Sequence, residues 1–368
     1  MKKFILISPK NRTAYNFRGD LIKAIIAKGY EVVVTGPNRI DVDKIKALGA
    51  RFVEIPANKN GTNPLADIKY MLALRRLMRV EKADATLGYT IKPAIYGAMA
   101  AKLAGVKSRS SMITGAGYIF VAKSLKAKIT GFIGKTLYKI GLRCANNVIF
   151  QNEDDKKEFV ELGLVKEKKC YVVNGSGVNM EHFAPAPFPE RLTFFMLSRA
   201  LYSKGVMEYL DACRVIHKKY PDVRLMYLGG IEPMQDAIPQ EVVQSYIDDG
   251  SIEYFGETPD VRQYTAQCSV YVLPSYREGT PRTVLEAMAM GRPIITTDVQ
   301  GCRGTVINEK TGFLVKDKSA EAVAEKMEWF INHPEVIPMM GEASRQLCAD
   351  KFEVGRVNDS MLEIMGIE

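Results

Sequence analysis

Short runs of apolar and β-branched residues alternate with segments of helical periodicity along most of the chain. Such short, nearly continuous apolar runs are typical of strands that are buried on both faces of a parallel sheet. We expect strands at 3–7, 31–35, 51–55, 85–87, 108–113, 147–151, 170–173, 192–197, 224–228, 252–255, 270–273, 293–297 and 312–315. Helical patterns lie between the strands, as at 19–28, 41–48 and 95–104, and residues 320–368 are mostly helical.

The alternation is interrupted once, where Ala-Pro-Ala-Pro-Phe-Pro at 184–189 predicts a stiff linker. The same pattern then starts again. An α/β fold of two Rossmann-like, doubly wound domains that face each other across a cleft is therefore expected, with the first domain at 1–185 and the second beginning at 190. Ligands of such domains bind at the carboxyl ends of the strands.

Composition excludes several classes of protein. The 368 residues are 47% hydrophobic and 25% charged, which are globular values. The apolar run at the start is too short for a signal peptide, and no uninterrupted run has the length of a transmembrane helix. Six cysteines without a C-x-x-C pair indicate reduced cytosolic thiols, and three scattered histidines do not indicate a metal site.

Charge is distributed unevenly between the two halves. Residues 1–185 carry 32 Lys and Arg against 15 Asp and Glu, a net +17, whereas residues 186–368 carry 19 against 27, a net −8. The basic half suggests an anionic partner. Nucleic acid, anionic lipid and phosphorylated substrates are all compatible with this charge.

Two glutamates eight positions apart, Glu278 and Glu286, occur in a Gly-Pro loop and in the helix that follows it. Thr280 is expected to cap this helix and Pro281 to take its first position. The helix N-terminus suits a phosphate, and Glu286 could accept from a ribose diol. The arrangement predicts a nucleotide-sugar site, although the spacing alone also fits a capped helix with two surface glutamates.

Other nucleotide-binding signatures are weak. The segments starting at Gly115 and Gly175 both begin G-x-G but lack the third glycine of a dinucleotide fingerprint. A Walker loop is missing from the sequence. NAD and ATP are therefore not the expected ligands.

The glutamate pair resembles the E-x7-E motif of family 4 retaining glycosyltransferases, which have the two-Rossmann GT-B architecture. Arg199 and Lys204 lie in a second segment, which is similar to the R-x4-K-G motif of that family. Residues 89–97, 113–118, 151–154 and 174–178 resemble the bacterial subgroup that builds capsule, O-antigen and related glycans on undecaprenyl diphosphate. The resemblance extends over nearly the whole chain.

The resemblance implies a role for each donor-site residue. It assigns the donor sugar to Glu278, Gly279 and Thr280, the ribose to Glu286, and the diphosphate to Arg199, Lys204, Pro281, Arg282 and Thr283. Cations that meet the charge developing on the leaving β-phosphate would lower the barrier, whereas the alternative is that Arg199 and Lys204 are solvated surface residues. The resemblance also implies retention of anomeric configuration, with no divalent metal and no cofactor.

The first domain departs from the family pattern at a position where many members have a histidine. Thr114 and Gly115 occupy the corresponding stretch, and we expect them to line the acceptor site without supplying a base. Arg12, Arg18 and Lys92 are candidates for binding the acceptor's diphosphate. Surface cations of a basic domain are the alternative for each of the three.

A basic stretch without any Asp or Glu runs from 85 to 152 and contains ten Lys or Arg. Within it, a helix at 119–142 has an apolar stripe flanked by Lys123, Lys126, Lys128, Lys135 and Lys139. The stripe consists of Leu125, Ile129, Phe132, Ile133, Leu137 and Ile140. Such a helix can place its stripe in lipid while its lysines meet anionic headgroups. The alternative is a helix that packs its stripe on the sheet.

We therefore expect a transferase that moves a sugar from a nucleotide donor, a UDP-sugar, to a saccharide on undecaprenyl diphosphate. It would be cytoplasmic and peripheral on the inner face of the cytoplasmic membrane. The resemblance implies that the first domain holds the acceptor, that 190–343 holds the donor, and that a helix at 344–368 crosses back to the first domain. A nucleotide-sugar epimerase of the same fold and a basic nucleic-acid-binding protein are the two alternatives.

Overall fold

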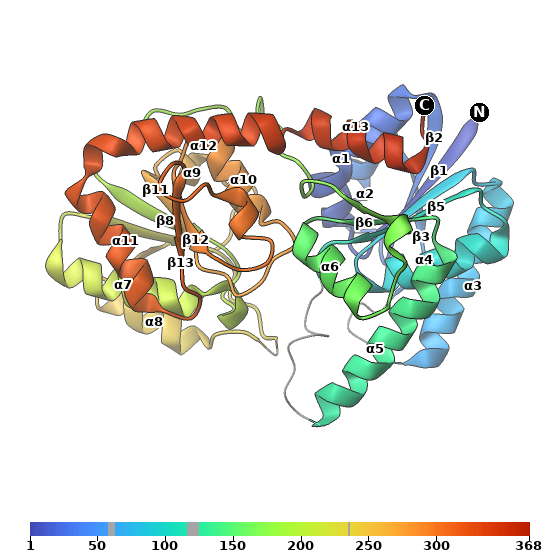
Figure 1. Cartoon of the computed structure of the whole chain (residues 1–368), viewed down its shortest axis with the longest axis horizontal. Coiled ribbons are helices and arrows are strands. Elements are labelled where there is room, and N and C mark those ends of the chain that lie inside the picture. Colours follow the sequence, from blue (N-terminus) through green and yellow to red (C-terminus); the bar gives the residue numbers. More distant parts are fainter. Residues whose placement is uncertain (58–62, 116–124, 235) are drawn as a thin grey trace. The chain divides into compact units, whose positions relative to one another are not determined.

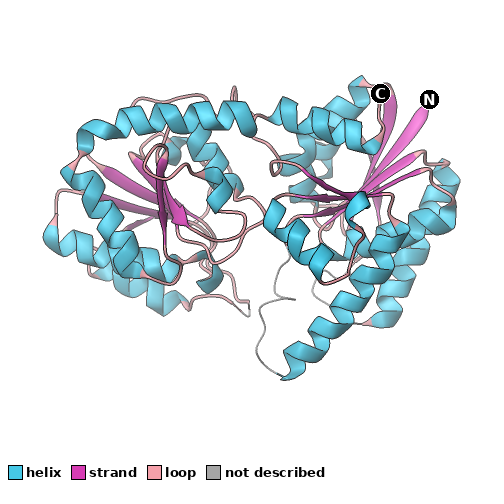
Figure 2. Cartoon of the chain, viewed as in Figure 1, coloured by secondary structure: helices cyan, strands magenta, loops and turns pink. Residues whose placement is uncertain are grey.

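The structure is a computed structural model that describes residues 1–57, 63–115, 125–234 and 236–368, with the backbone alone for 125–130. The chain forms two compact units. The first comprises Met1–Ser176 and Gly355–Glu368, and the second comprises Gly177–Val354. Each unit has a parallel sheet with helices on both faces, as the alternation of strands and helices predicts (Figures 1 and 2).

The first unit is built on a seven-stranded sheet of order β3-β2-β1-β4-β5-β6-β7, in which every pair of neighbours is parallel. Its strands are β1 (Lys2–Ile7), β2 (Tyr30–Gly36), β3 (Arg51–Glu54), β4 (Ala85–Tyr89), β5 (Ser108–Ile113), β6 (Asn147–Phe150) and β7 (Cys170–Val172). The strand order reverses between β1 and β4. That reversal is the switch point at which doubly wound sheets bind ligands.

Helices cover both faces of this first sheet (Figure 1). One face packs against α1 (Asn11–Ala27), α2 (Val42–Lys46) and α13 (Val354–Met365). The other packs against α3 (Pro64–Glu81), α4 (Ile91–Ala104), α5 (Leu125–Cys144) and α6 (Glu153–Glu161), and a 3-10 turn, η2 (Glu167–Lys169), precedes β7. The central strands are buried on both sides, which is why they read as continuous apolar runs.

The second unit repeats the design with a six-stranded parallel sheet of order β10-β9-β8-β11-β12-β13. Its strands are β8 (Thr193–Leu197), β9 (Arg224–Leu228), β10 (Glu253–Tyr254), β11 (Val270–Leu273), β12 (Ile294–Thr297) and β13 (Gly312–Val315). Its helices are η3 (Tyr202–Lys204), α7 (Val206–Lys219), α8 (Gln240–Asp248), α9 (Arg262–Thr265), α10 (Arg282–Ala289), η4 (Arg303–Thr305), α11 (Ala320–Asn332), η5 (Pro334–Val336) and α12 (Ile337–Lys351). Here the switch point lies between β8 and β11.

The units divide the chain at Ser176, not near 185 as the Pro-rich segment suggests. Val178 and Phe183 are buried in the core of the second unit, and Phe188 packs against it. The segment 184–189 therefore lies on the second unit. Its prolines are typical of a linker, and the sequence does not show that Phe188 among them packs against a core.

Two helix ends differ from expectation. α1 begins at Asn11, eight residues before the predicted start, so the expected first loop is largely helical. The final helix expected at 344–365 is instead two helices, because Val178 pairs with Glu353 in an isolated parallel bridge. The backbone N–H of Val178 donates to Phe352 O at 2.8 Å, which holds residues 352–353 out of helical conformation. The chain then joins the first unit at Gly355.

Candidate functional site

The candidate site of the second unit lies at its switch point, where β8 and β11 end side by side. β8 ends at Leu197 and leads to the η3 turn that carries Lys204, whereas β11 ends at Leu273 and leads to the loop that carries Glu278. The two motifs are separated by more than seventy residues in the sequence. The parallel pairing of the strands brings them together.

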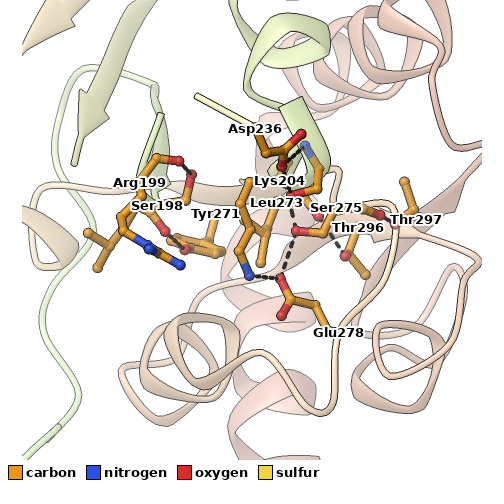
Figure 3. A network of polar contacts seen from close by, with 12 residues as sticks. Ser198, Arg199, Lys204, Asp236, Tyr271, Leu273, Ser275, Glu278, Thr296 and Thr297 are labelled. Atoms are coloured by element: carbon orange, nitrogen blue, oxygen red, sulfur yellow. Dashed lines mark hydrogen bonds and ion pairs between the residues drawn. The ribbon is translucent and has the colours of Figure 1, made fainter. Parts of the chain in front are cut away.

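Lys204 and Glu278 form a direct ion pair, which is drawn in Figure 3. Both side chains are largely buried, with 26% and 12% of their surfaces exposed. Ser275 also donates from Oγ to Oε1 of the same carboxylate, at 2.9 Å. The resemblance assigned Lys204 to the diphosphate and Glu278 to the sugar of one donor. In the structure the two side chains are in direct contact.

Close backbone approaches fix the two loops. Gly205, directly after Lys204, has φ +69°, and a Cβ there would lie 2.0 Å from Pro274 O. Gly301 has φ +79°, and a Cβ there would lie 2.2 Å from Glu278 O. The Glu278 N–H donates to Gln300 O at 3.1 Å. Only glycine fits at either position, so the geometry of the site depends on both.

The helix α10 begins one residue later than predicted. Pro281 is its N-cap and Arg282 its first residue, while Thr280 donates from Oγ1 to Gly279 O at 2.9 Å. The expectation that Thr280 caps the helix is wrong because its hydroxyl bonds within its own loop. The N-cap residue is a proline, and its side chain supplies no cap bond to the first N–H groups of α10. Those groups remain suited to an anion.

Glu286 and Arg282 form an i,i+4 ion pair on α10, with Arg282 Nε at 3.1 Å from Glu286 Oε1. Arg282 also donates to Gly177 O at 2.5 Å. Burial raises the pKa of Glu286, and the charge and hydrogen bond of Arg282 oppose that rise. Arg282 thus holds Glu286 in place, and its expected contact with the donor diphosphate stays a prediction.

Arg199 is exposed on the loop after β8, and one of its guanidinium nitrogens lies 3.6 Å from Met234 Sδ. Figure 3 shows no bond from it to the Lys204–Glu278 pair. Tyr271 lies below this loop and donates to Leu197 O at 3.1 Å. A hydrogen bond to Thr283 lowers the pKa of Tyr271, although burial raises it overall. Tyr271 thus connects the end of β8 to the start of α10.

Three residues that support the site, Ser203, Asp236 and Ser275, were not singled out from the sequence. Ser275 bonds Glu278, as described above. Asp236 Oδ2 accepts from the Ser203 N–H at 3.1 Å and from the Ser203 hydroxyl, which fixes the turn that carries Lys204. Ser275 could have been suspected from its place two residues after a strand. Asp236 lies on a separate loop, and the sequence contains no signal for it.

Two of the acceptor candidates, Arg18 and Lys92, already have side-chain partners within the first unit. Arg18 is buried, and it lies over the Tyr89 ring at 5.3 Å with a guanidinium nitrogen 3.0 Å from Met112 Sδ. Lys92 pairs with Asp67 at 2.5 Å, and Tyr96 donates to the same carboxylate at 3.0 Å. Neither residue is a solvated surface cation, and their role toward an acceptor stays a prediction.

The remaining candidates flank the switch point of the first unit. Arg12 is exposed in the first turn of α1, after β1, and Thr114 and Gly115 directly follow β5. At the switch point itself, the Tyr89 hydroxyl lies 2.5 Å from Ser8 Oγ and 3.0 Å from the hydroxyl of Thr13. All of these residues lie at carboxyl ends of strands, which is the edge of a doubly wound sheet where ligands bind.

The expected membrane helix is α5. Lys123 lies outside the described residues, and of Lys126 and Lys128 only the backbone is described. Lys139 is exposed and Lys135 is half-buried. Tyr138 and Leu142 make the core contacts of α5, whereas Phe132, Ile133 and Ile140 of the predicted stripe are 73%, 53% and 44% exposed. The described part of the stripe therefore points largely away from the core.

No three side chains among His, Cys, Asp and Glu lie close enough to hold a metal ion in the described ranges. A membrane-crossing helix is likewise not found there, since none combines sufficient length with sufficient apolar character.

Sequence comparisons agree with this geometry. The sequence profile described as "Glycosyl transferases group 1" matches residues 178–347, and that described as "Glycosyl transferase 4-like" matches residues 5–152. The chain is 28% identical over 335 residues to an N,N'-diacetylbacillosaminyl-diphospho-undecaprenol alpha-1,3-N-acetylgalactosaminyltransferase of Campylobacter jejuni, with 87% of each chain covered. It is 25% identical over 328 residues to the UDP-Gal:alpha-D-GlcNAc-diphosphoundecaprenol alpha-1,3-galactosyltransferase of Escherichia coli, covering 84% of this chain and 82% of that one.

Solved structures share the fold. A sucrose-phosphate synthase from Thermosynechococcus elongatus aligns with a TM-score of 0.81 at 20% identity, covering 99% of this chain and 98% of that one. A glycosyltransferase from Rickettsia africae aligns with a TM-score of 0.78, also at 20% identity, covering 100% and 98%. The two sheets, the site on the second unit and the two profile matches lead to one conclusion: the chain is a GT-B glycosyltransferase and belongs to the group 1, or family 4-like, glycosyltransferases.

Proposed function

We propose that this enzyme transfers a sugar, with retention of anomeric configuration, from a UDP-sugar to a saccharide carried on undecaprenyl diphosphate. The observation that carries the proposal is the Lys204–Glu278 pair at the switch point of the second unit. The Campylobacter jejuni and Escherichia coli relatives support the acceptor class, since both names specify a diphospho-undecaprenol substrate. The name of the second relative also specifies a UDP-sugar donor.

The donor would bind with its parts in a fixed order. Glu278, with Gly279 and Thr280, would accept hydroxyls of the sugar, and Glu286 would accept the ribose diol. The diphosphate would take Lys204, Arg199 and the N–H groups that open α10. As the sugar leaves, negative charge grows on the β-phosphate, and these fixed cations and dipoles stabilise it. The leaving phosphate would then accept the acceptor's proton, so a protein base is not required.

A panel of nucleotide sugars tests the donor assignment. The expected donor raises the melting temperature of the wild-type enzyme, because a ligand that binds only the native state stabilises it. Transfer is then measured with a synthetic undecaprenyl-diphosphate sugar as acceptor. Glu278→Ala should depress turnover, and Glu286→Ala should weaken donor binding. If both variants matched the wild type on every donor tested, the proposal would fail. The epimerase alternative has no support in either family match.

The acceptor's lipid calls for a membrane surface, and we propose that the first unit supplies it through α5 and α3. Phe132, Ile133 and Ile140 of α5 are exposed beside Lys139. Every large exposed side chain of α3 is either apolar or cationic. The apolar ones are Leu65, Ile68, Leu72 and Val80, and the cationic ones are Lys69, Arg76 and Arg79. The one carboxylate in its first three turns, Asp67, is paired with Lys92. Apolar side chains beside cations fit an anionic bilayer.

Vesicle sedimentation tests this surface. The enzyme should bind vesicles containing phosphatidylglycerol, and binding should weaken as salt is added because the headgroup charge is screened. Phe132→Ser combined with Ile133→Ser should weaken binding by about 10-fold or more. Val215→Ser is the matched control, since Val215 is 56% exposed on α7 of the second unit. Equal binding to a random oligonucleotide would favour the nucleic-acid alternative.

A further inference from the structure

Ser275 is a buried residue whose hydroxyl bonds to residues of the candidate donor site. It is the second residue after β11, and none of its surface is exposed. Its carbonyl accepts from the Thr297 hydroxyl on β12. Its own hydroxyl is 2.9 Å from Glu278 Oε1 and 3.5 Å from Lys204 O. The strand end therefore fixes the hydroxyl, and the hydroxyl contacts the carboxylate.

Glu278 is held unequally at its two oxygens. Lys204 and Ser275 both bind Oε1, and no donor among the described residues is bonded to Oε2 (Figure 3). The two donors differ in freedom. Lys204 has a flexible stem and three ammonium donors, so its ammonium can turn toward a diphosphate. Ser275 is fully buried and has no comparable freedom to move.

We infer that Ser275 is the positioning residue of Glu278. It holds Oε1 in place when the ammonium of Lys204 turns to the donor's diphosphate, and it thereby presents Oε2 to the sugar hydroxyls. The inference rests on the proposed role of Glu278 in binding the donor sugar. Without the hydroxyl, the carboxylate follows the ammonium or rotates, and sugar binding suffers while diphosphate binding does not.

The test compares a ligand that contains the sugar with one that lacks it. UDP is the probe without the sugar, and the donor identified in the nucleotide-sugar panel is the probe with it. Ser275→Ala should leave the Kd for UDP within about twofold of wild type and lower kcat/KM for the donor by about 10-fold, the effect of losing one hydrogen bond to a charged group. Ser275→Thr, which keeps the hydroxyl, should recover most of this loss.

Thr296→Val is the matched control. Thr296 is also fully buried at this edge of the sheet, but its hydroxyl donates to Leu273 O, at 2.7 Å, and not to Glu278. This variant should lose thermal stability without changing the ratio between UDP binding and donor turnover. If Ser275→Ala weakened UDP and donor equally, or changed neither, Ser275 would not position Glu278. If the wild type itself used no nucleotide sugar, the proposed function would fail instead.

Discussion

At the scale of single residues, the approach of Gly301 to Glu278 constrains the backbone of the site. A Cβ at Gly301 would lie 2.2 Å from Glu278 O, and its φ of +79° is unfavourable for any other residue. Gly301→Ala should therefore displace the Glu278 loop and lower kcat/KM by about 10-fold or more. Gly304→Ala is the control, because a Cβ there meets only Lys351 Nζ at 3.7 Å. Equal loss in both variants would contradict the argument.

The pKa of Glu286 gives a pH prediction at the same scale. Burial raises this pKa, so Glu286 becomes neutral at a higher pH than an ordinary glutamate as the pH falls. Above the raised pKa, the charged form of Glu286 lowers the free energy of unfolding. This destabilisation decreases as the pH falls and is gone once the pH reaches the pKa that Glu286 has in the unfolded state. A neutral Glu286 accepts the ribose diol less well. KM for the donor should therefore rise with acidification in the wild type.

Glu286→Gln is the comparison for this pH dependence. The amide does not titrate, so its KM should start higher and stay nearly constant between neutral and acid pH. Initial rates over a pH series, with stability checked at each pH, measure both enzymes. Identical profiles for the two would show that Glu286 does not titrate in contact with the donor.

Much of the site could be predicted from sequence because its residues follow strand ends. Arg199, Lys204 and Glu278 were singled out by their motifs, and the structure places all three after the ends of β8 and β11, since parallel strands gather their carboxyl ends at one edge. The direction of a long side chain is not set by its position in the sequence. Arg282, for example, reaches along its own helix to Glu286, a pairing that was not predicted from the sequence. Thr280 likewise bonds its own loop in place of the helix.

At the scale of elements, all the predicted strands are present, with ends within two residues, whereas helix ends were less predictable. Buried parallel strands are continuous apolar runs, so their signal is local. The break between α12 and α13 is not local. It depends on Val178, which pairs with Glu353 from more than 170 positions away. Amphipathic periodicity continues across such a break, so the sequence predicts one helix.

The Pro-rich segment gives a prediction for an element that sequence misassigned. Arg292 is fully buried, lies 4.5 Å from the Phe188 ring, and donates to Pro187 O and Ala266 O at 3.0 and 3.1 Å. Arg292→Lys should lower the free energy of unfolding by roughly 1–3 kcal/mol, because an ammonium loses the stacking and the two-carbonyl contact. Urea denaturation measures this.

Arg191→Lys is the control for that measurement. Arg191 also donates to two backbone carbonyls, Asp222 O at 2.7 Å and Pro221 O at 3.4 Å, but it is exposed. Its replacement should cost no more than about 0.5 kcal/mol. A similar cost for both variants would mean that Arg292 does not anchor the segment beyond ordinary carbonyl bonding.

At the scale of the whole molecule, charge and chemistry are divided between the two units. The net +17 of residues 1–185 belongs largely to the unit with the exposed apolar faces of α3 and α5. The acidic half carries the paired Lys204 and Glu278. A basic surface raises the local concentration of an anionic lipid substrate. Lys204 is paired with Glu278 and belongs to the acidic half, so this cation favours one specific anion over a polyanion such as nucleic acid. This division supports a lipid-linked acceptor over nucleic acid.

The cysteines test the fold of both units in one measurement. Burial raises the pKa of Cys268, Cys302 and Cys348 to about 12 and of Cys170 to about 11, and it also raises the pKa of Cys213. These groups are thiols without disulfides in the structure. Since the thiolate is the nucleophile, iodoacetamide at pH 8 should label the buried thiols only when the protein unfolds.

Cys144 and Cys170 are both only half-buried, but the raised pKa of Cys170 keeps its thiol protonated at pH 8. Cys144 lies near the end of α5, where its thiol donates to the Ile140 carbonyl. It should be labelled first in the native enzyme, and Cys144→Ser should remove this early phase. In urea, the four thiols of the second unit should become reactive together, since each is buried in the same unit. Peptide mass spectrometry over time assigns each site. Rapid native labelling of Cys302, which lies beneath the Glu278 loop, would contradict the packing of the donor site.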